Sequence, residues 1–186
     1  MKKILSIMLL FSVYSLFAQE FELTPDGLKE KTTGKNYAVI SAEGKTANQL
    51  YNSAIKYINI NYKNPQEVIK ADLKGEYIKW ETYIPVIGMI NNTFISVAAD
   101  ATITMQLFFK DGKAKFEIIN QDIRNSKNKG PLGHVMIKGR RSNGFPIYDE
   151  KDGKLIQEDL KKDIESYYNT TLYKIKEILL DDDNDW

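Results

Sequence analysis

The chain has 186 residues, and its 26 Lys and Arg nearly balance its 25 Asp and Glu, so no strong overall charge attracts nucleic acid. A hydrophobic content of 42% argues against disorder and is enough for one domain with a core. Cysteine is absent, which excludes disulfides, thiolate metal sites, a cysteine nucleophile and a lipid anchor on cysteine.

The N-terminal segment 1–18 has the layout of a secretory signal peptide. Lys2 and Lys3 precede an apolar run over 4–17, and Ala18 stands where polar sequence begins. The run is shorter than the about 20 residues that a membrane span requires. We therefore expect cleavage near Ala18, a periplasmic or secreted protein, and no transmembrane helix in the mature chain. The mature chain is predicted to be one domain over 19–180 with an acidic tail over 181–186.

The first half of this domain reads as strand, helix, strand, strand. A lead-in strand over 21–23 and a main strand over 36–42 precede a helix that begins after Thr46, where Gln49 completes a capping box. Apolar residues at three- and four-residue intervals mark one face of that helix: Ala47, Leu50, Tyr51, Ala54, Tyr57, Ile58 and Tyr62. Strands are then predicted over 67–73, with Ile69, Ala71 and Leu73 on one side, and over 76–83.

A long hairpin over 93–123 is the clearest predicted element. Apolar residues occupy the odd positions of its first arm from Ile95 to Phe109, and polar residues most even ones, which predicts one buried and one wet face. Asp111-Gly112 suits a two-residue turn. In the return arm the alternation changes phase, which predicts a bulge near Ile118-Ile119.

The rest of the chain is predicted to be irregular up to about residue 153, with short strands over 135–137 and 146–148. A final helix is expected over 155–180. Its apolar stripe is Ile156, Leu160, Ile164, Tyr168, Leu172, Ile175 and Leu179. The acidic run 181–185 lacks the Gly and distal Glu of a calcium-binding loop, so we interpret it as a solvated tail.

The order strand, helix, four strands, helix is the repeat unit of the TBP-like fold. The chain resembles a family of small exported Bacteroidetes proteins, a domain of unknown function with that fold. The short sequence motifs that carry this resemblance lie at 49–54, 57–58, 65–69 and in the hairpin 107–116. The resemblance implies an α+β fold in which an antiparallel sheet carries two helices on one face. It implies an exported location and brings no catalytic residues.

The first candidate site is a basic loop over 124–141, which contains six cations and no acid: Arg124, Lys127, Lys129, Lys138, Arg140 and Arg141. His134, the only histidine, lies within it. Such a loop could bind phosphate, lipopolysaccharide or an acidic partner surface. The alternative is a solvated loop without a ligand. One histidine does not make a metal site, and no Ser or Cys partner is evident for it as a base.

The second candidate is the apolar segment 84–90, which could form an exposed lip through Ile84, Val86, Ile87, Met89 and Ile90. The alternative is a packed passage that completes the core. The tyrosines could stack on sugars or bases, although at helical spacing core packing explains them more simply.

No catalytic or metal motif is evident, and no cofactor is implied. The sequence therefore favours a non-enzymatic binding module of the cell envelope, whose partner is an unknown envelope protein or an anionic ligand and not nucleic acid. The alternative is an envelope hydrolase that acts through carboxylates, for which no pair of Asp or Glu residues stands out.

Overall fold

The computed structural model describes residues 19–92 and 96–181, and its centre is an antiparallel sheet of five strands in the order β3-β7-β6-β5-β4. The strands are β3 (Tyr37–Ser41), β4 (Ile69–Leu73), β5 (Tyr77–Asn91), β6 (Ser96–Lys110) and β7 (Lys113–Asn125). The predicted signal peptide and residues 182–186 of the predicted tail lie outside the described residues. Among the described residues, no helix is both long enough and apolar enough to span a membrane.

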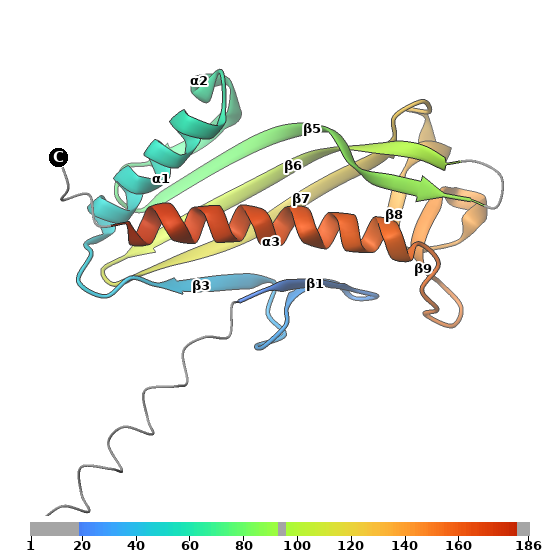
Figure 1. The fold of residues 1–186 in the computed structure, drawn as a ribbon, viewed down its shortest axis with the longest axis horizontal. Coiled ribbons are helices and arrows are strands. Elements are labelled where there is room, and N and C mark those ends of the chain that lie inside the picture. The colour runs from blue at the N-terminus through green and yellow to red at the C-terminus, as the bar shows by residue number, and fades with distance from the viewer. Residues whose placement is uncertain (1–18, 93–95, 182–186) are drawn as a thin grey trace, which may run out of the picture.

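The two long helices α1 (Ala47–Asn61) and α3 (Glu158–Leu180) pack on one face of this sheet (Figure 1). This arrangement confirms the predicted α+β architecture. The predicted stripe of α3 is buried from Leu160 to Leu179. Ile156 is an exception, because the helix begins at Glu158 rather than at residue 155.

Helix α1 begins as the sequence predicts. The backbone N–H of Gln49 donates to Thr46 Oγ1 over 3.3 Å, and Gln49 Oε1 accepts from the backbone N–H of Thr46 over 2.8 Å. These two bonds form the expected capping box, which satisfies N–H groups that have no partner inside the helix.

The β6–β7 hairpin also follows its prediction. Ile103 and Leu107 are buried, and Asp111 and Gly112 connect the two strands. The register shifts so that Met105 lies opposite Ile118 while Thr104 lies opposite Asn120, which places the bulge at Ile119. Ile95 lies outside the described residues.

Three expectations about the neighbouring strands are wrong. The strand predicted over 67–73 begins only at Ile69, because Pro65 starts the short helix α2 (Pro65–Val68). A bulge at Lys70 then places Ile69 opposite Trp80 and Ala71 opposite Lys79, so Ile69 does not share a face with Ala71. Strand β5 does not end near residue 83 but continues to Asn91 through the apolar segment, with a register shift between Ile84 and Gly88.

Smaller elements surround the main sheet. Strands β1 (Phe21–Thr24) and β2 (Gly27–Glu30) form a hairpin, of which only the first strand was predicted. Strands β8 (Val135–Gly139) and β9 (Phe145–Asp149) confirm the two predicted short strands and pair in parallel.

Side chains of α3 and of its N-cap residue Gln157 complete the backbone hydrogen bonding of two strand edges. On β5, Asp163 accepts from the backbone N–H of Met89 over 3.3 Å, and the amide of Gln157 bonds to both the N–H and the C=O of Asn91. A side chain on Gly88 would meet Asp163 Cβ at 2.7 Å, so the close approach of helix and strand requires glycine there.

On β1, Asn169 bonds to both the N–H and the C=O of Phe21, and Glu165 accepts from the N–H of Leu23 over 2.6 Å. Helix α3 therefore takes the place of a neighbouring strand at both edges, which protects them from pairing with another chain.

Candidate binding surface on the open face of the sheet

The face of the sheet opposite the helices is here called the open face. It carries the side chains of each strand that alternate with the buried ones. On β5 it presents Tyr77, Lys79, Glu81 and Tyr83, of which Tyr83 is 61% exposed. Because side chains alternate across a strand, these residues point away from α1 and α3. The open face is therefore where the sheet itself can meet a partner.

At the end of the open face near the Asp111–Gly112 turn, here called the turn end, one row of side chains crosses all five strands. The row follows from the strand register and consists of Leu73, Tyr77, Phe108, Lys115 and Val39. Lys115 Nζ lies 4.4 Å from the ring centre of Phe108 and 5.3 Å from that of Tyr37. The same ammonium group pairs with Glu117 Oε1 at 2.8 Å, so its charge is already compensated.

The opposite end of the open face, here called the distal end, lies where β5 ends and β6 begins, and it is organised around Asp100. This carboxylate is 4% exposed although it belongs to the polar face. The hydroxyl of Tyr83 donates to Asp100 Oδ2 over 3.0 Å, and Lys129 forms an ion pair with the same oxygen. Asp100 thereby joins β5 to the basic loop.

A second carboxylate, Asp122, holds the same loop. Its oxygens accept from Arg124 Nε over 3.0 and 2.9 Å, and Oδ1 lies 3.4 Å from His134 Nδ1. Arg124 Nη1 also donates to the carbonyl of Lys129 over 2.9 Å. The loop that follows β7 is therefore fixed to the sheet by two carboxylates that its own sequence does not contain.

The predicted basic residues fall into two groups. Arg124, Lys129 and Arg140 pair with Asp122, Asp100 and Glu150. Within the described part of the chain, the remaining three form no ion pair with an acid, namely Lys127, Lys138 and Arg141. The segment 124–141 contains no acid in sequence, but folding brings three to it, which sequence reading alone missed.

The residues of the apolar segment 84–90 also fall into two groups, one buried and one exposed. Ile87 and Ile90 are buried at 5% and 2% exposure, Ile84 is half-buried, and Val86 and Met89 are 57% and 37% exposed. The bulge in β5 causes this division, because it changes which residues face the helices. Val86 follows Tyr83 by three residues, and Tyr83 is the residue of β5 that is joined to the basic loop through Asp100.

The loop after β7 adds an apolar residue that the sequence analysis did not select. Leu132 is 59% exposed on a 3-10 turn over Pro131–Gly133. The N–H of Gly133 bonds to the carbonyl of Gly130, and a Cβ on Gly133 would lie 1.8 Å from the carbonyl oxygen of Asn128. The backbone is thus closely packed beneath an exposed leucine.

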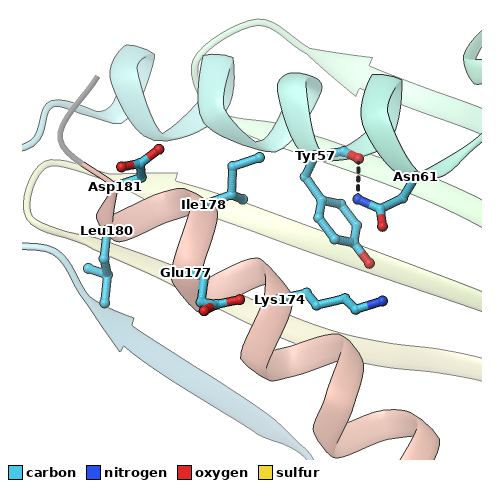
Figure 2. Close-up of a pocket in the computed structure, with 7 residues that line it drawn as sticks. All are labelled: Tyr57, Asn61, Lys174, Glu177, Ile178, Leu180 and Asp181. Carbon is cyan, nitrogen blue, oxygen red and sulfur yellow. Dashed lines mark hydrogen bonds between the residues drawn. The ribbon is translucent and has the colours of Figure 1, made fainter. Parts of the chain in front are cut away.

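A separate hollow of about 570 Å³ lies between the C-terminal parts of α1 and α3, and Figure 2 shows its lining. It is lined by Tyr57, Asn61, Lys174, Glu177, Ile178, Leu180 and Asp181. The amide of Asn61 donates to the carbonyl of Tyr57 over 2.9 Å, which occupies one polar group of the hollow. The hollow is remote from both candidate sites and was not predicted.

The tyrosines of α1 serve mainly the core. Tyr57 is 5% exposed and packs edge-on against Trp80, whose indole N–H donates to the hydroxyl of Tyr62 over 3.1 Å. Burial raises the pKa of the Tyr57 hydroxyl, and it raises the pKa of Tyr167 on α3 to about 12. Among the described residues, no three His, Cys, Asp or Glu side chains are grouped so that they could hold a metal ion.

Comparison with known proteins adds two solved structures. No family model and no curated protein matches the chain. A DUF4468 family protein from Bacteroides ovatus is similar, with 11% identity and a TM-score of 0.49 over 81% of this chain and 88% of that one. A TBP-like protein from Parabacteroides distasonis is also similar, with 8% identity and a TM-score of 0.46 over 77% and 90%. Their names, a DUF4468 family protein and a TBP-like protein, are of the kind that the sequence resembles.

Proposed function

We propose that the protein is an exported, non-enzymatic binding module of the bacterial cell envelope, and that it binds an anionic partner through the distal end of the open face. The observation that carries this proposal is the contact of Tyr83 and Lys129 with the same oxygen of Asp100. It joins two segments that are far apart in sequence, β5 with its exposed apolar side chains and the loop after β7 with its basic side chains.

The charge of this surface favours an anionic partner. Asp100, Asp122 and Glu150 are already engaged by Lys129, Arg124 and Arg140, so they do not offset the other cations. Lys127, Lys138 and Arg141 are left to attract a negatively charged partner. Lys127 lies in the exposed loop after β7, Lys138 on the short strand β8, and Arg141 at the start of the 3-10 turn Arg141–Asn143, all between β7 and β9 and all exposed.

The alternative function is a hydrolase that uses carboxylates. The contact of 3.4 Å between Asp122 and His134 would be its starting point, since a carboxylate can orient an imidazole base. However, the single Nε–H of Arg124 is shared between both oxygens of Asp122, so this carboxylate is already paired with a guanidinium. This arrangement supports a binding role rather than a general base.

Binding can be tested on an immobilised polyanion such as dextran sulfate. We expect the variant with Lys127, Lys138 and Arg141 all changed to Ala to bind several-fold more weakly than the wild type at low salt, and the difference to vanish at high salt. The matched control changes Lys74, Lys110 and Lys113 at the turn end, which removes the same charge from exposed positions. Equal binding by both variants, or no binding by the wild type, would contradict the proposal.

Export is tested separately. We expect the mature protein to begin at Gln19, because Ala18 is the small residue at the end of the apolar run. Intact-mass measurement of the protein from the envelope or culture medium checks this. Recovery of the protein in the cytoplasm with Met1 retained would contradict the expected export.

A further inference from the structure

We propose that the anionic partner is the surface of a lipid bilayer, onto which the distal end docks with cations and apolar side chains together. This inference rests on the proposed function and specifies its ligand. Peripheral proteins bind such surfaces by combining apolar side chains that enter the headgroup region with Lys and Arg that meet anionic lipids. The distal end presents both kinds of side chain.

The apolar side chains come from two elements that meet at Asp100. Tyr83 and Val86, on and beside the bulge of β5, are 61% and 57% exposed, and Pro85 between them is exposed as well. Leu132 is 59% exposed and follows Lys129 by three residues on the loop after β7. A surface on which several large apolar side chains gather commonly marks an interaction site.

These side chains are held outward by an ordered framework. Lys127 N–H donates to Asn125 Oδ1 over 2.9 Å, Ser126 N–H donates to the carbonyl of Ala98 over 2.9 Å, and Gly130 N–H donates to Asn128 Oδ1 over 3.0 Å. Such a loop exposes Leu132 at little further cost in conformational entropy when a partner binds.

The arrangement of cations suits an extended negative surface better than a small anion. Arg141 lines a small cleft with Phe145 and Pro146, and Lys127, which follows the Ser126 bond to Ala98 at the start of β6, does not line this cleft. Lys129 remains 55% exposed even though it pairs with Asp100. Cations spread over one end of a molecule can each meet a different lipid headgroup, and each contributes independently to binding.

The test is co-sedimentation with vesicles of phosphatidylcholine and phosphatidylglycerol at 3:1, compared with phosphatidylcholine alone. The protein should begin at Gln19, because the apolar segment 4–17 would bind vesicles by itself. All the elements that we describe lie after this residue. We expect binding to the anionic vesicles at low salt and little binding to the neutral ones.

Two variants separate the contributions. Changing Val86 and Leu132 to Ser should weaken vesicle binding about tenfold or more. Serine has little apolar surface, so the variant gains less free energy when these side chains leave water for the bilayer. Changing Lys127, Lys138 and Arg141 to Ala should weaken it about fivefold per cation. The controls at the turn end are Val39→Ser with Leu73→Ser, which are 40% and 55% exposed on the same open face, and the Lys74, Lys110 and Lys113 variant. Both controls should bind like the wild type.

The outcomes distinguish this inference from the proposed function. Binding to dextran sulfate without binding to anionic vesicles would overturn the bilayer as the partner and leave an anionic partner standing. Vesicle binding that is unchanged by Val86→Ser with Leu132→Ser, or equal on neutral vesicles, would also overturn it. Absence of binding to either material would overturn both proposals. Thermal unfolding of every variant shows that weaker binding does not come from a loss of fold.

Discussion

The two faces of the central sheet are made by the same strands and differ in what holds them together. On the face covered by α1 and α3, Trp80, Met105 and Phe116 are fully buried, and Trp80 stacks on Phe116 with ring centres 6.2 Å apart. On the open face, polar contacts such as the bond of 3.2 Å from the hydroxyl of Thr104 to Glu81 Oε2 accompany a partly exposed aromatic pair, Tyr77 and Phe108. The covered face is therefore expected to provide most of the stability, and the open face is available for binding.

The largest expected effect tests the covered face. Leu107→Ala removes a side chain that is 1% exposed, and we expect it to lower the free energy of unfolding by about 2–5 kcal/mol, through lost apolar burial and the cavity that remains. Urea unfolding followed by circular dichroism measures this. The matched control is Leu73→Ala, a leucine of the same sheet that is 55% exposed, for which we expect about 0.5 kcal/mol or less. Similar losses for both variants would contradict the division into two faces.

This division was largely predictable from sequence, because strand alternation in the hairpin and the helical spacing of α3 are local patterns. The period of two from Ala99 to Phe109 identified the buried face, and the change of phase identified the bulge at Ile119. The boundaries of β4 and β5 were not predictable in the same way. The helix that begins at Pro65 delays the start of β4, and the bulge at Lys70 changes which of its residues share a face. The end of β5 is not recognisable because the apolar residues 84–90 show no alternation.

A smaller effect is expected at the distal end, where the open face contains one buried charge. Asp100→Ala leaves the Tyr83 hydroxyl and the Lys129 ammonium without their shared acceptor, and we expect a loss of about 1–3 kcal/mol. Asp122→Ala is the comparison, since the Asp122 side chain is 38% exposed and water can replace its contacts, so we expect about 0–1 kcal/mol. Equal losses would show that Asp100 does not anchor the loop.

The candidate surface was only partly predictable. The cations of the loop and the apolar residues of 84–90 are visible in sequence, but their meeting at Asp100 depends on the register of β5, β6 and β7. Asp100 occupies an even position of a polar strand face, where alternation predicts exposure. Its contacts are with Tyr83 on the neighbouring strand and with Lys129, which lies 29 residues further along the chain. No local pattern contains that information, and the exposure of Leu132 likewise depends on how the loop packs.

Glu30 is a buried carboxylate on β2, outside the central sheet, and it makes the stability of the fold depend on pH. Burial raises the pKa of Glu30, but hydrogen bonds from Thr33 and Thr32 outweigh this effect, and the pKa lies below its ordinary value. Because the folded pKa is below the unfolded one, the carboxylate stabilises the fold above the unfolded pKa, and this contribution is lost as the pH falls through the folded pKa.

We therefore expect Glu30→Gln to lower the free energy of unfolding by about 1–3 kcal/mol at pH 7, and the difference from the wild type to shrink at pH 3. Urea unfolding at both pH values measures it. A difference of the same size at pH 3 would mean that the charge of Glu30 does not contribute.

The smallest expected effect lies at the turn end of the open face. Lys115 contacts the rings of Phe108 and Tyr37 and pairs with Glu117, but its side chain is 36% exposed. Cation–π contacts and ion pairs at such positions contribute about 0.5–1 kcal/mol at most. Lys115→Met keeps most of the aliphatic contact with the rings and removes the charge, so we expect a loss of less than about 1 kcal/mol that decreases further in high salt. A loss as large as that of Leu107→Ala would show that the open face also carries the stability of the sheet, and that its side chains are not free to serve binding alone.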